Sequence, residues 1–545
     1  MAPSKKGGNA MLLARLIGIA LILTVAALSQ IPATAAETVA SAAAQDHLGT
    51  VSFPTSCSSE AQPGIEKGVA LLHSFQYEEA RQTFADVETR DAKCAIAHWG
   101  QAMALYHQLW DFPDEKQLQE GHKQIEQANK LHPKTPRERG FLNAAAAFYQ
   151  ENEKLSHVER RQAYTAALEK LREQVPGDVE IESFYALSLV SLADDEVDTM
   201  ANLNKAIAIL QPLFEKYPDH PGVAHYLIHA TDRPELAEQG LAAARRYAAI
   251  APDSSHALHM PSHIFVRLGL WQESINSNIA AIAAGARAAE LHKAESHYQT
   301  HPMGFLNYSY LQSGQEAKAR EVIAHTDHVV GASEEDKADH RAYLAAYTAL
   351  ELHRWNEAAS LPVPAIRKEW LDTTYWARAI GAARAGDAAA AEVAVKDLTG
   401  SVEERESKAR KIGYPVDKEK ATDLREAEAW LAFAQGKTDD ALQELRAAAD
   451  HQDKNGPDSV IIPAREMLAD MLLEAKRPSD ALNEYKIALK NAPNRFDALL
   501  GAGRSAQASG DTNSAQTFYA KLTEDCPAGA DRPELAEAKT VLAKK

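Results

Sequence analysis

The chain of 545 residues contains only three cysteines, Cys57, Cys94 and Cys526. Three thiols cannot build the disulfide framework of a small secreted fold or a zinc site with four thiolate ligands. Basic residues are also fewer than acidic residues: the chain has 58 Lys and Arg and 76 Asp and Glu, which gives a formal net charge of −18. Binding to nucleic-acid phosphates or to an anionic membrane depends on an excess of cations. We therefore expect neither to be a partner.

Long hydrophobic runs are missing beyond the N-terminus. Leu16–Leu28 reads LIGIALILTVAAL, follows a basic stretch without acids at 1–15, and precedes the small residues Ala33–Ala35. This is the three-part layout of a secretory signal peptide, and the run is shorter than the roughly 20 residues of a membrane span. We expect 1–36 to be a signal peptide and the chain to be exported to the periplasm or secreted. Without cleavage the segment would be an N-terminal membrane anchor; with cleavage, no stable membrane insertion is expected.

Export would place the cysteines in an oxidising compartment, where disulfides persist. Cys57 precedes the first expected helix and Cys94 opens a later one, so a Cys57–Cys94 bond could fix the N-terminal segment. Two buried free thiols are the alternative, and Cys526 has no partner in either case.

The pattern from about Gln62 to the C-terminus is helical throughout. Apolar residues and alanines recur at i, i+3, i+4 and i+7, as on one face of an α-helix, and no segment alternates like a strand. Short breaks, such as Ser313-Gly314 and 384–387, separate segments of helix length. These features predict an all-α fold.

The breaks recur with a fixed period near the C-terminus. Ala481 is followed one unit later by Ala515, and Pro493 is followed at the same interval by Pro527. This interval resembles that of the tetratricopeptide repeat, a helical hairpin of about 34 residues. The resemblance implies a solenoid of about nine or ten stacked hairpins that wind into a right-handed superhelix with a concave face.

Residue size within the repeat follows the packing that such a hairpin needs. Small residues, Gly503 and Ala515 among them, stand where the two helices of a hairpin cross closely. The larger Tyr485 and Tyr519 are expected to fill the space to the next hairpin. We expect a lead segment at 37–61, an N-terminal repeat block at 62–398, a charged linker at 399–424 and a C-terminal repeat block at 425–545.

Histidines are concentrated in one part of the chain. Nine of the 21 lie between His220 and His301, most densely in HYLIH at 225–229 and HALHMPSHIF at 256–265. The step from His225 to His259 equals the repeat interval, and so does the step from His229 to His263. Two successive repeats therefore carry histidine at the same two positions.

These four histidines form a candidate metal site. Each pair is spaced i, i+4, which puts both rings on one helix face, and helices that pack about 8–10 Å apart could bring the two pairs together. Imidazole suits zinc, copper and iron, and the spacing does not choose among these metals and manganese. Nearby residues could line the groove or support the ligands: Asp232, His256, His297, His301 and Tyr308.

Two functions follow from these observations. In the first, an exported tetratricopeptide scaffold binds a peptide or protein partner in a His-rich concave groove, as the resemblance implies for the fold. In the second, the four histidines bind a metal ion, and the protein is a metal-binding protein or a metal-dependent enzyme. Histidines that serve only the packing of the helices are a third interpretation. The His-rich segment also resembles a block in exported bacterial tetratricopeptide proteins, which supports the fold and export but carries no activity.

Overall fold

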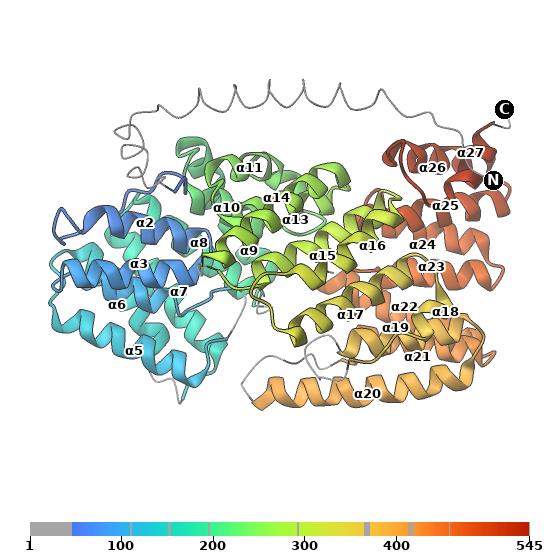
Figure 1. Cartoon of the computed structure of the whole chain (residues 1–545), viewed down its shortest axis with the longest axis horizontal. Helices are drawn as coiled ribbons and strands as arrows, with labels where there is room; N and C mark the ends of the chain where they lie inside the picture. The colour runs from blue at the N-terminus through green and yellow to red at the C-terminus, as the bar shows by residue number, and fades with distance from the viewer. Residues whose placement is uncertain are drawn as a thin grey trace, which may run out of the picture. The chain divides into compact units, whose positions relative to one another are not determined.

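The computed structural model describes residues 46–109, 112–150, 154–194, 197–291, 294–364, 371–411, 416, 419–456 and 458–543 (Figure 1). The helices of the described residues all belong to one compact unit, Leu48–Lys545. The predicted signal peptide, 1–36, lies outside the described residues.

The first half of this unit contains twelve helices and no strand among the residues described. Their bounds are α2 (Gln62–His73), α3 (Tyr77–Arg90), α4 (Ala95–Met103), α5 (Glu115–Lys130), α6 (Pro136–Tyr149), α7 (His157–Gln174), α8 (Val179–Asp194), α9 (Thr199–Lys216), α10 (Pro221–Ala230), α11 (Ala237–Ile250), α12 (Ser255–His259) and α13 (Pro261–Arg267).

The second half continues in the same way, with one short 3₁₀ turn, η1 (Thr326–His328). The α-helices are α14 (Trp271–Glu290), α15 (His297–Gln312), α16 (Glu316–His325), α17 (Glu334–Glu351), α18 (Trp355–Ala359), α19 (Leu371–Arg384), α20 (Ala388–Lys411), α21 (Thr422–Ala434), α22 (Thr438–Asn455), α23 (Ala464–Glu474), α24 (Pro478–Asn491), α25 (Phe496–Ala508), α26 (Thr512–Asp525) and α27 (Leu535–Ala543).

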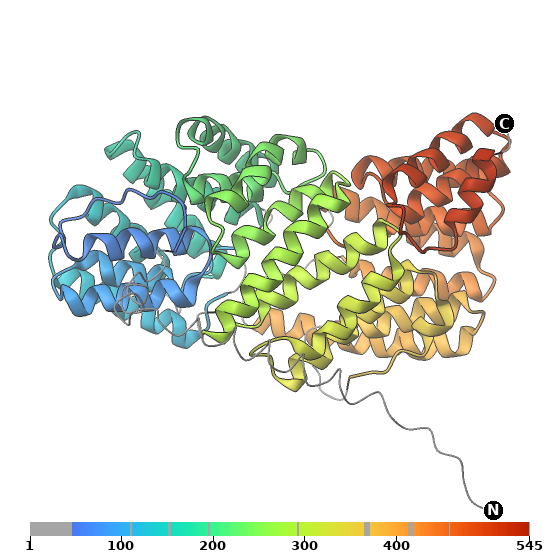
Figure 2. The same ribbon diagram turned by 45° about the horizontal axis from the view of Figure 1, so that its top comes forward.

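Consecutive helices pack against each other as hairpins, and successive hairpins lie side by side in chain order (Figures 1 and 2). Each hairpin buries one face against its partner and another against its neighbours, so the core is continuous over many repeats. The predicted all-α solenoid of helical hairpins is therefore confirmed.

The C-terminal repeats show why the small residues occupy their positions. Ala481 is fully buried and Ala515 is nearly so, while Tyr485 and Tyr519 are buried beside them. A Cβ added to Gly503 would come within 2.8 Å of the Tyr519 ring. The crossing helices are thus too close to accept a larger side chain, as the repeat pattern predicts.

The segment 399–424 differs from the linker that we expected. Helix α20 continues through its first half to Lys411. The charged residues there are good helix formers, and Glu404–Lys408 and Glu406–Arg410 form ion pairs one turn apart, which support a solvated helix. The segment also does not divide the apolar core, because one buried cluster runs from Ala346 to Ala538 and includes Val402 of α20.

The main division of the core lies earlier in the chain. One large buried cluster extends from Leu48 to Phe265, and the second begins at Ala346. Between them, helices α14 to α16 contribute only small separate clusters, such as the one around Met303. The His-rich segment thus lies at the end of the first large core.

A disulfide joins Cys57 to Cys94, with the two Cα atoms 4.9 Å apart. Cys94 is the N-cap residue of α4, so the disulfide joins the segment before α2 to the start of α4. Cys526 is a free, half-buried thiol.

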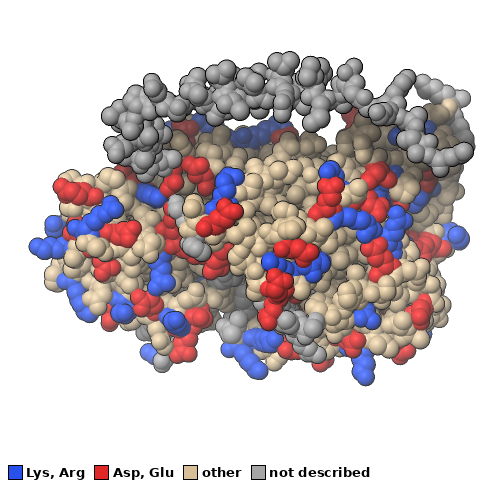
Figure 3. Space-filling view, in the orientation of Figure 1, with Lys and Arg blue, Asp and Glu red and all other residues tan. Residues whose placement is uncertain are grey.

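Among the described residues, no helix combines the length and the apolar character needed to cross a bilayer. On the face shown in Figure 3, Lys and Arg side chains alternate with Asp and Glu, and no continuous basic patch is visible on its described part.

The close packing of the repeats predicts opposite effects for two glycine substitutions. A Cβ at Gly501 would lie 2.2 Å from the buried Tyr485 ring, so Gly501→Ala should destabilise the chain by about 1–3 kcal/mol. Gly400 is an exposed position within α20 with open space around it, so Gly400→Ala should be neutral or stabilising by up to about 1 kcal/mol. Urea unfolding measures both changes. Equal stability of the two variants would contradict this packing.

Candidate metal centre

The four predicted metal ligands lie on two neighbouring repeats. Helix α10 carries His225 and His229, whereas α12 ends at His259 and α13 carries His263. Pro261 starts α13 and cannot donate a backbone hydrogen bond, so the second helix is broken between its two histidines. The sequence predicted one group of four histidines, and the structure distributes them over two groups of three.

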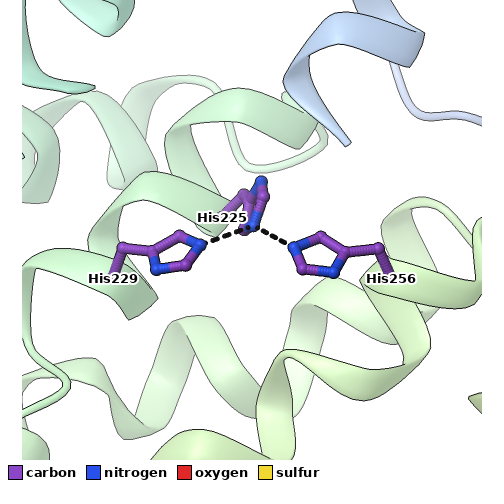
Figure 4. A group of neighbouring side chains, drawn as sticks. All are labelled: His225, His229 and His256. Atoms are coloured by element: carbon purple, nitrogen blue, oxygen red, sulfur yellow. Dashed lines mark hydrogen bonds between the residues drawn. The ribbon is translucent and has the colours of Figure 1, made fainter. Parts of the chain in front are cut away.

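The first group joins His225 and His229 to His256 at the start of α12 (Figure 4). His225 lies in the middle, and its Nε2 atom is 3.0 Å from Nε2 of His229 and 3.0 Å from Nε2 of His256. The side chain of His225 is fully buried, and His229 is half-buried.

The second group joins His259 and His263 to His301 of α15. The Nε2 atoms of His259 and His263 are 3.1 Å apart, and the ring of His301 lies 4.6 Å from the ring of His259 between centroids. His259 is buried and His301 is exposed, so this group reaches the surface of the described structure. In each group the candidate ligand atoms all lie within 4.8 Å of one another.

Hydrogen bonds fix the tautomers of the second group. Nδ1 of His263 lies 2.7 Å from Oδ2 of Asp232, an acceptor, so it carries the ring hydrogen. Nδ1 of His259 lies 2.7 Å from Oδ1 of Asn278, whose amide nitrogen donates to the Ser274 carbonyl. In the neutral form of both rings, the two Nε2 lone pairs point at each other. Two lone pairs 3.1 Å apart repel unless a cation lies between them.

The first group is constrained in a related way. Nδ1 of His225 donates to the backbone carbonyl of His73 at 2.6 Å, so its Nε2 carries the lone pair. That lone pair faces two ring nitrogens, His229 Nε2 and His256 Nε2. A single lone pair in the ring plane accepts one hydrogen bond well, not two. A metal ion would satisfy all three nitrogens at once.

The separations suit a metal ion with imidazole ligands. At a metal–nitrogen distance of about 2.0–2.1 Å, two ligand nitrogens lie about 2.9 Å apart at a right angle and about 3.4 Å apart at the tetrahedral angle. The observed 3.0 and 3.1 Å fall within this range. The partners of the Nδ1 atoms, His73 carbonyl, Asn278 and Asp232, are of the kind that orient metal-binding histidines.

An aromatic ring covers each group. The ring of Phe75 lies 4.4 to 5.5 Å from the three rings of the first group, and that of Phe305 lies 4.5 to 5.4 Å from those of the second. Phe75 has a left-handed backbone with φ of 54°, a conformation that few non-glycine residues adopt. The two groups are neighbours: the ring centroids of His229 and His263 are 6.4 Å apart.

Burial disfavours the charged form of four of these imidazoles. Desolvation, followed by the neighbouring histidines, lowers the pKa of His225, His256 and His259 well below its ordinary value, and lowers the pKa of His229 to about 3. Burial would raise the pKa of Asp232, but Arg267 and His263 beside it hold that pKa below its ordinary value. These four histidines are therefore neutral, and an ionised carboxylate, Asp232, lies beside the second group.

A segment distant in sequence completes the support of Asp232. Its Oδ1 atom accepts from Arg267 Nε at 2.8 Å and from the Ser459 hydroxyl at 3.1 Å. Arg267 also donates to the backbone carbonyl of Asp458 at 3.3 Å. The connection between α22 and α23 therefore packs against the second group.

A third cluster, His73, Glu180 and His220, has its hydrogen bonds satisfied without a metal. His220 Nδ1 accepts from the Val223 backbone at 3.2 Å, so its Nε2 donates to Glu180 at 3.1 Å. His73 contacts Glu180 at 2.7 Å and the Tyr226 hydroxyl at 2.8 Å. Burial would raise the pKa of Glu180, but the two histidines lower it to about 2. This cluster holds the His73 carbonyl that fixes His225.

The other residues predicted for the site differ in whether they belong to the two histidine groups. His256 and His301, expected only as supporting residues, are members of the groups, and Asp232 supports His263 as expected. His297 lies outside both groups, beside Glu295. Tyr308 accepts from Arg495 at 2.6 Å in a separate buried network. Asn278 and the His73 carbonyl were not predicted, because nothing in their local sequence marks an acceptor for a histidine in another repeat.

Comparison with known proteins identifies one repeat directly. Residues 497–528 match the tetratricopeptide repeat family, so the chain contains at least one such repeat, formed by α25 and α26. No curated protein sequence matches the chain.

Several solved helical-repeat structures resemble it weakly. Yeast Tom70 has 13% identity over 89% of this chain and 96% of its own, with a TM-score of 0.34. A human IFIT1 dimer with m7Gppp-AAAA has 14% identity over 83% and 94%, with a TM-score of 0.36. The Cut9–Hcn1 tetramer of the APC/C has 10% identity over 75% and 76%, with a TM-score of 0.35. Likeness at this level does not extend to function.

The lowered pKa values predict acid-sensitive folding of the metal-free protein. Unfolded histidines bind protons near pH 6.5 while the folded ones stay neutral, so folding stability should decrease as the pH falls from about 6.5 toward 3. We expect the melting temperature of the metal-free chain to fall between pH 7 and 5, and the slope to be shallower in His229→Gln. Differential scanning calorimetry measures both, and an unchanged slope in that variant would contradict the burial of a neutral His229.

Proposed function

We propose that this protein binds transition-metal ions, one in each three-histidine group. The observation that carries the proposal is the pair His259 and His263, whose Nδ1 hydrogens are committed to Asn278 and Asp232 and whose Nε2 atoms lie 3.1 Å apart. A proton could bridge the two nitrogens, but burial lowers the pKa of His259 and opposes this. A metal ion would offset the cost of burying its charge by forming coordinate bonds with both lone pairs.

The ligand set narrows the choice of metal. Each group offers three imidazoles, with no thiolate or carboxylate among the three. Such a set suits copper and zinc, whereas manganese prefers oxygen ligands. Three protein ligands leave a coordination position open, as at catalytic rather than structural zinc sites. An ion there could activate water or bind a small substrate, so an enzymatic role is part of this proposal.

A peptide-binding scaffold is the second candidate. It is supported by the tetratricopeptide repeat at 497–528, a fold used widely for protein binding. Two of the histidines, His225 and His259, are 0% and 1% exposed and could not reach a peptide, whereas His301 is exposed. A scaffold would bind its partner equally well before and after chelation.

Export is proposed together with this function. The support is the signal-peptide pattern at 1–36 and the Cys57–Cys94 disulfide, which would persist in an oxidising compartment. Export to the periplasm or secretion would give the site access to metal ions outside the cytoplasm.

Metal content tests the proposal. The untagged chain, purified and reconstituted with copper or zinc, should hold about two ions by elemental analysis. His256→Gln and His301→Gln, one in each group, should each lower the content toward one ion, and the double variant should hold almost none. His297→Gln is the matched control, since His297 lies one turn from His301 on α15 but outside both groups. Equally low content in wild type and variants would refute the proposal.

The supporting carboxylate generates a separate prediction. Asp232→Asn keeps the size of the side chain but removes the charge that orients His263. We expect metal affinity of the second group to fall about 10–100-fold, with the first group unchanged, as measured by competition with a chelator of known affinity. Unchanged affinity at both groups would show that Asp232 does not act through His263.

A further inference from the structure

A cavity of about 370 Å³ lies in the second half of the unit. Its walls come from α17, α19, α20, α21, α22 and the connection before α23, and they include Tyr347, Trp376, Asp423, Glu426 and Asp458. The volume falls in the range of about 300–1,000 Å³ that is typical of small-molecule sites.

The charges that line this cavity are unbalanced. Three carboxyl groups face it, those of Asp423, Glu426 and Asp458, and Arg405 is the one Lys or Arg among its described lining residues. Arg405 pairs with Asp372 at 2.5 Å and lies 3.8 Å from Asp423. Its charge is therefore shared between two carboxylates, and the described lining holds more acidic than basic side chains.

The three carboxyl groups differ in exposure, since Glu426 is buried, Asp423 is partly exposed and Asp458 is exposed. Burial raises the pKa of Glu426 well above its ordinary value, and the negative charge of Asp423 contributes to this shift. A cation bound in the cavity would offset the cost of charging Glu426, where the low dielectric makes the interaction strongest.

Two aromatic rings form a corner beside the carboxyl groups. The centroids of Tyr347 and Trp376 are 5.5 Å apart, and the ring planes are inclined by 52°. The indole nitrogen of Trp376 donates to Oε2 of Glu426 at 2.8 Å, which fixes the carboxyl group at the edge of the indole. Aromatic faces next to carboxylates bind ammonium and guanidinium groups through cation–π contacts.

A metal ion is a poorer fit to this cavity. The carboxyl groups of Asp423, Glu426 and Asp458 are not among the described clusters whose ligand atoms lie within 4.8 Å of one another. Carboxylates spread over a larger space, with aromatic walls between them, fit a cation that carries a hydrocarbon part.

We propose that this cavity binds a small organic cation whose alkylammonium or guanidinium group lies between the carboxyl groups and the aromatic corner. The cavity contains none of the grouped histidines, and its occupancy does not require a metal; the two sites meet at Arg267, which donates both to Asp232 and to the Asp458 carbonyl.

Calorimetric titration of the full chain, freed of metal by chelation, tests the proposal. Putrescine and agmatine are the probes, 1,4-butanediol is the neutral control of matched length, and succinate is the anionic control. We expect saturable binding of one diamine or agmatine per chain, weakened by salt, and no binding of the diol or of succinate. The tripeptide Gly-Lys-Gly separates a free amine from a lysine side chain.

Substitutions locate the binding. Glu426→Gln and Asp458→Asn should each weaken binding at least 10-fold. Glu428→Gln should bind as wild type, because Glu428 lies on the same helix but pairs with Lys420 and does not line the cavity. The proposal is overturned if neither cation binds at millimolar concentration, if succinate or only the peptide binds, or if both variants bind like wild type. Since the chain is metal-free throughout, these outcomes do not depend on the histidine groups.

Discussion

The arrangement of the site depends on where the histidine ring hydrogens lie. Nδ1 of His225 donates to a backbone carbonyl, and Nδ1 of His259 and His263 donate to Asn278 and Asp232. In the neutral form of each ring the lone pair therefore lies on Nε2, and each Nε2 faces a nitrogen of a neighbouring histidine. A buried set of converging lone pairs is unfavourable without a cation. The surrounding fold makes the arrangement hold, because each acceptor is itself fixed by other contacts.

The repeat architecture explains why the two histidine groups resemble each other and where they differ. Two successive repeats place His225 and His259 at equivalent positions, and likewise His229 and His263. The break at Pro261 and the entry of His301 from α15 then separate the copies, so that each group gains a third histidine from the following repeat region. Each group also has an aromatic ring packed against it, Phe75 against the first group and Phe305 against the second.

The sequence predicted the helical fold well, because the repeat interval and the small residues at helix crossings follow directly from hairpin packing. Histidine spacing likewise identified the helix faces of α10, α12 and α13. The division into two groups depended on the kink at Pro261 and on His301, whose position is set by tertiary packing of α15. The charged composition of 399–424 suggested a linker, but ion pairs one turn apart support a helix to Lys411 instead.

Support from distant segments could not be predicted from local patterns. Asp232 is held by Arg267 and by Ser459, which belongs to a much later part of the chain, and His225 is held by the carbonyl of His73. A backbone carbonyl has no sequence signature at all. Such contacts link the first large core to the connection between α22 and α23.

Anomalous X-ray diffraction from crystals of the metal-loaded protein, recorded at the absorption edge of the bound metal, tests the account most directly. The account predicts two peaks, one within about 2.0–2.2 Å of the Nε2 atoms of His259 and His263 and one at the same distance from Nε2 of His225. Histidine groups without anomalous density in crystals grown with saturating copper or zinc would contradict it.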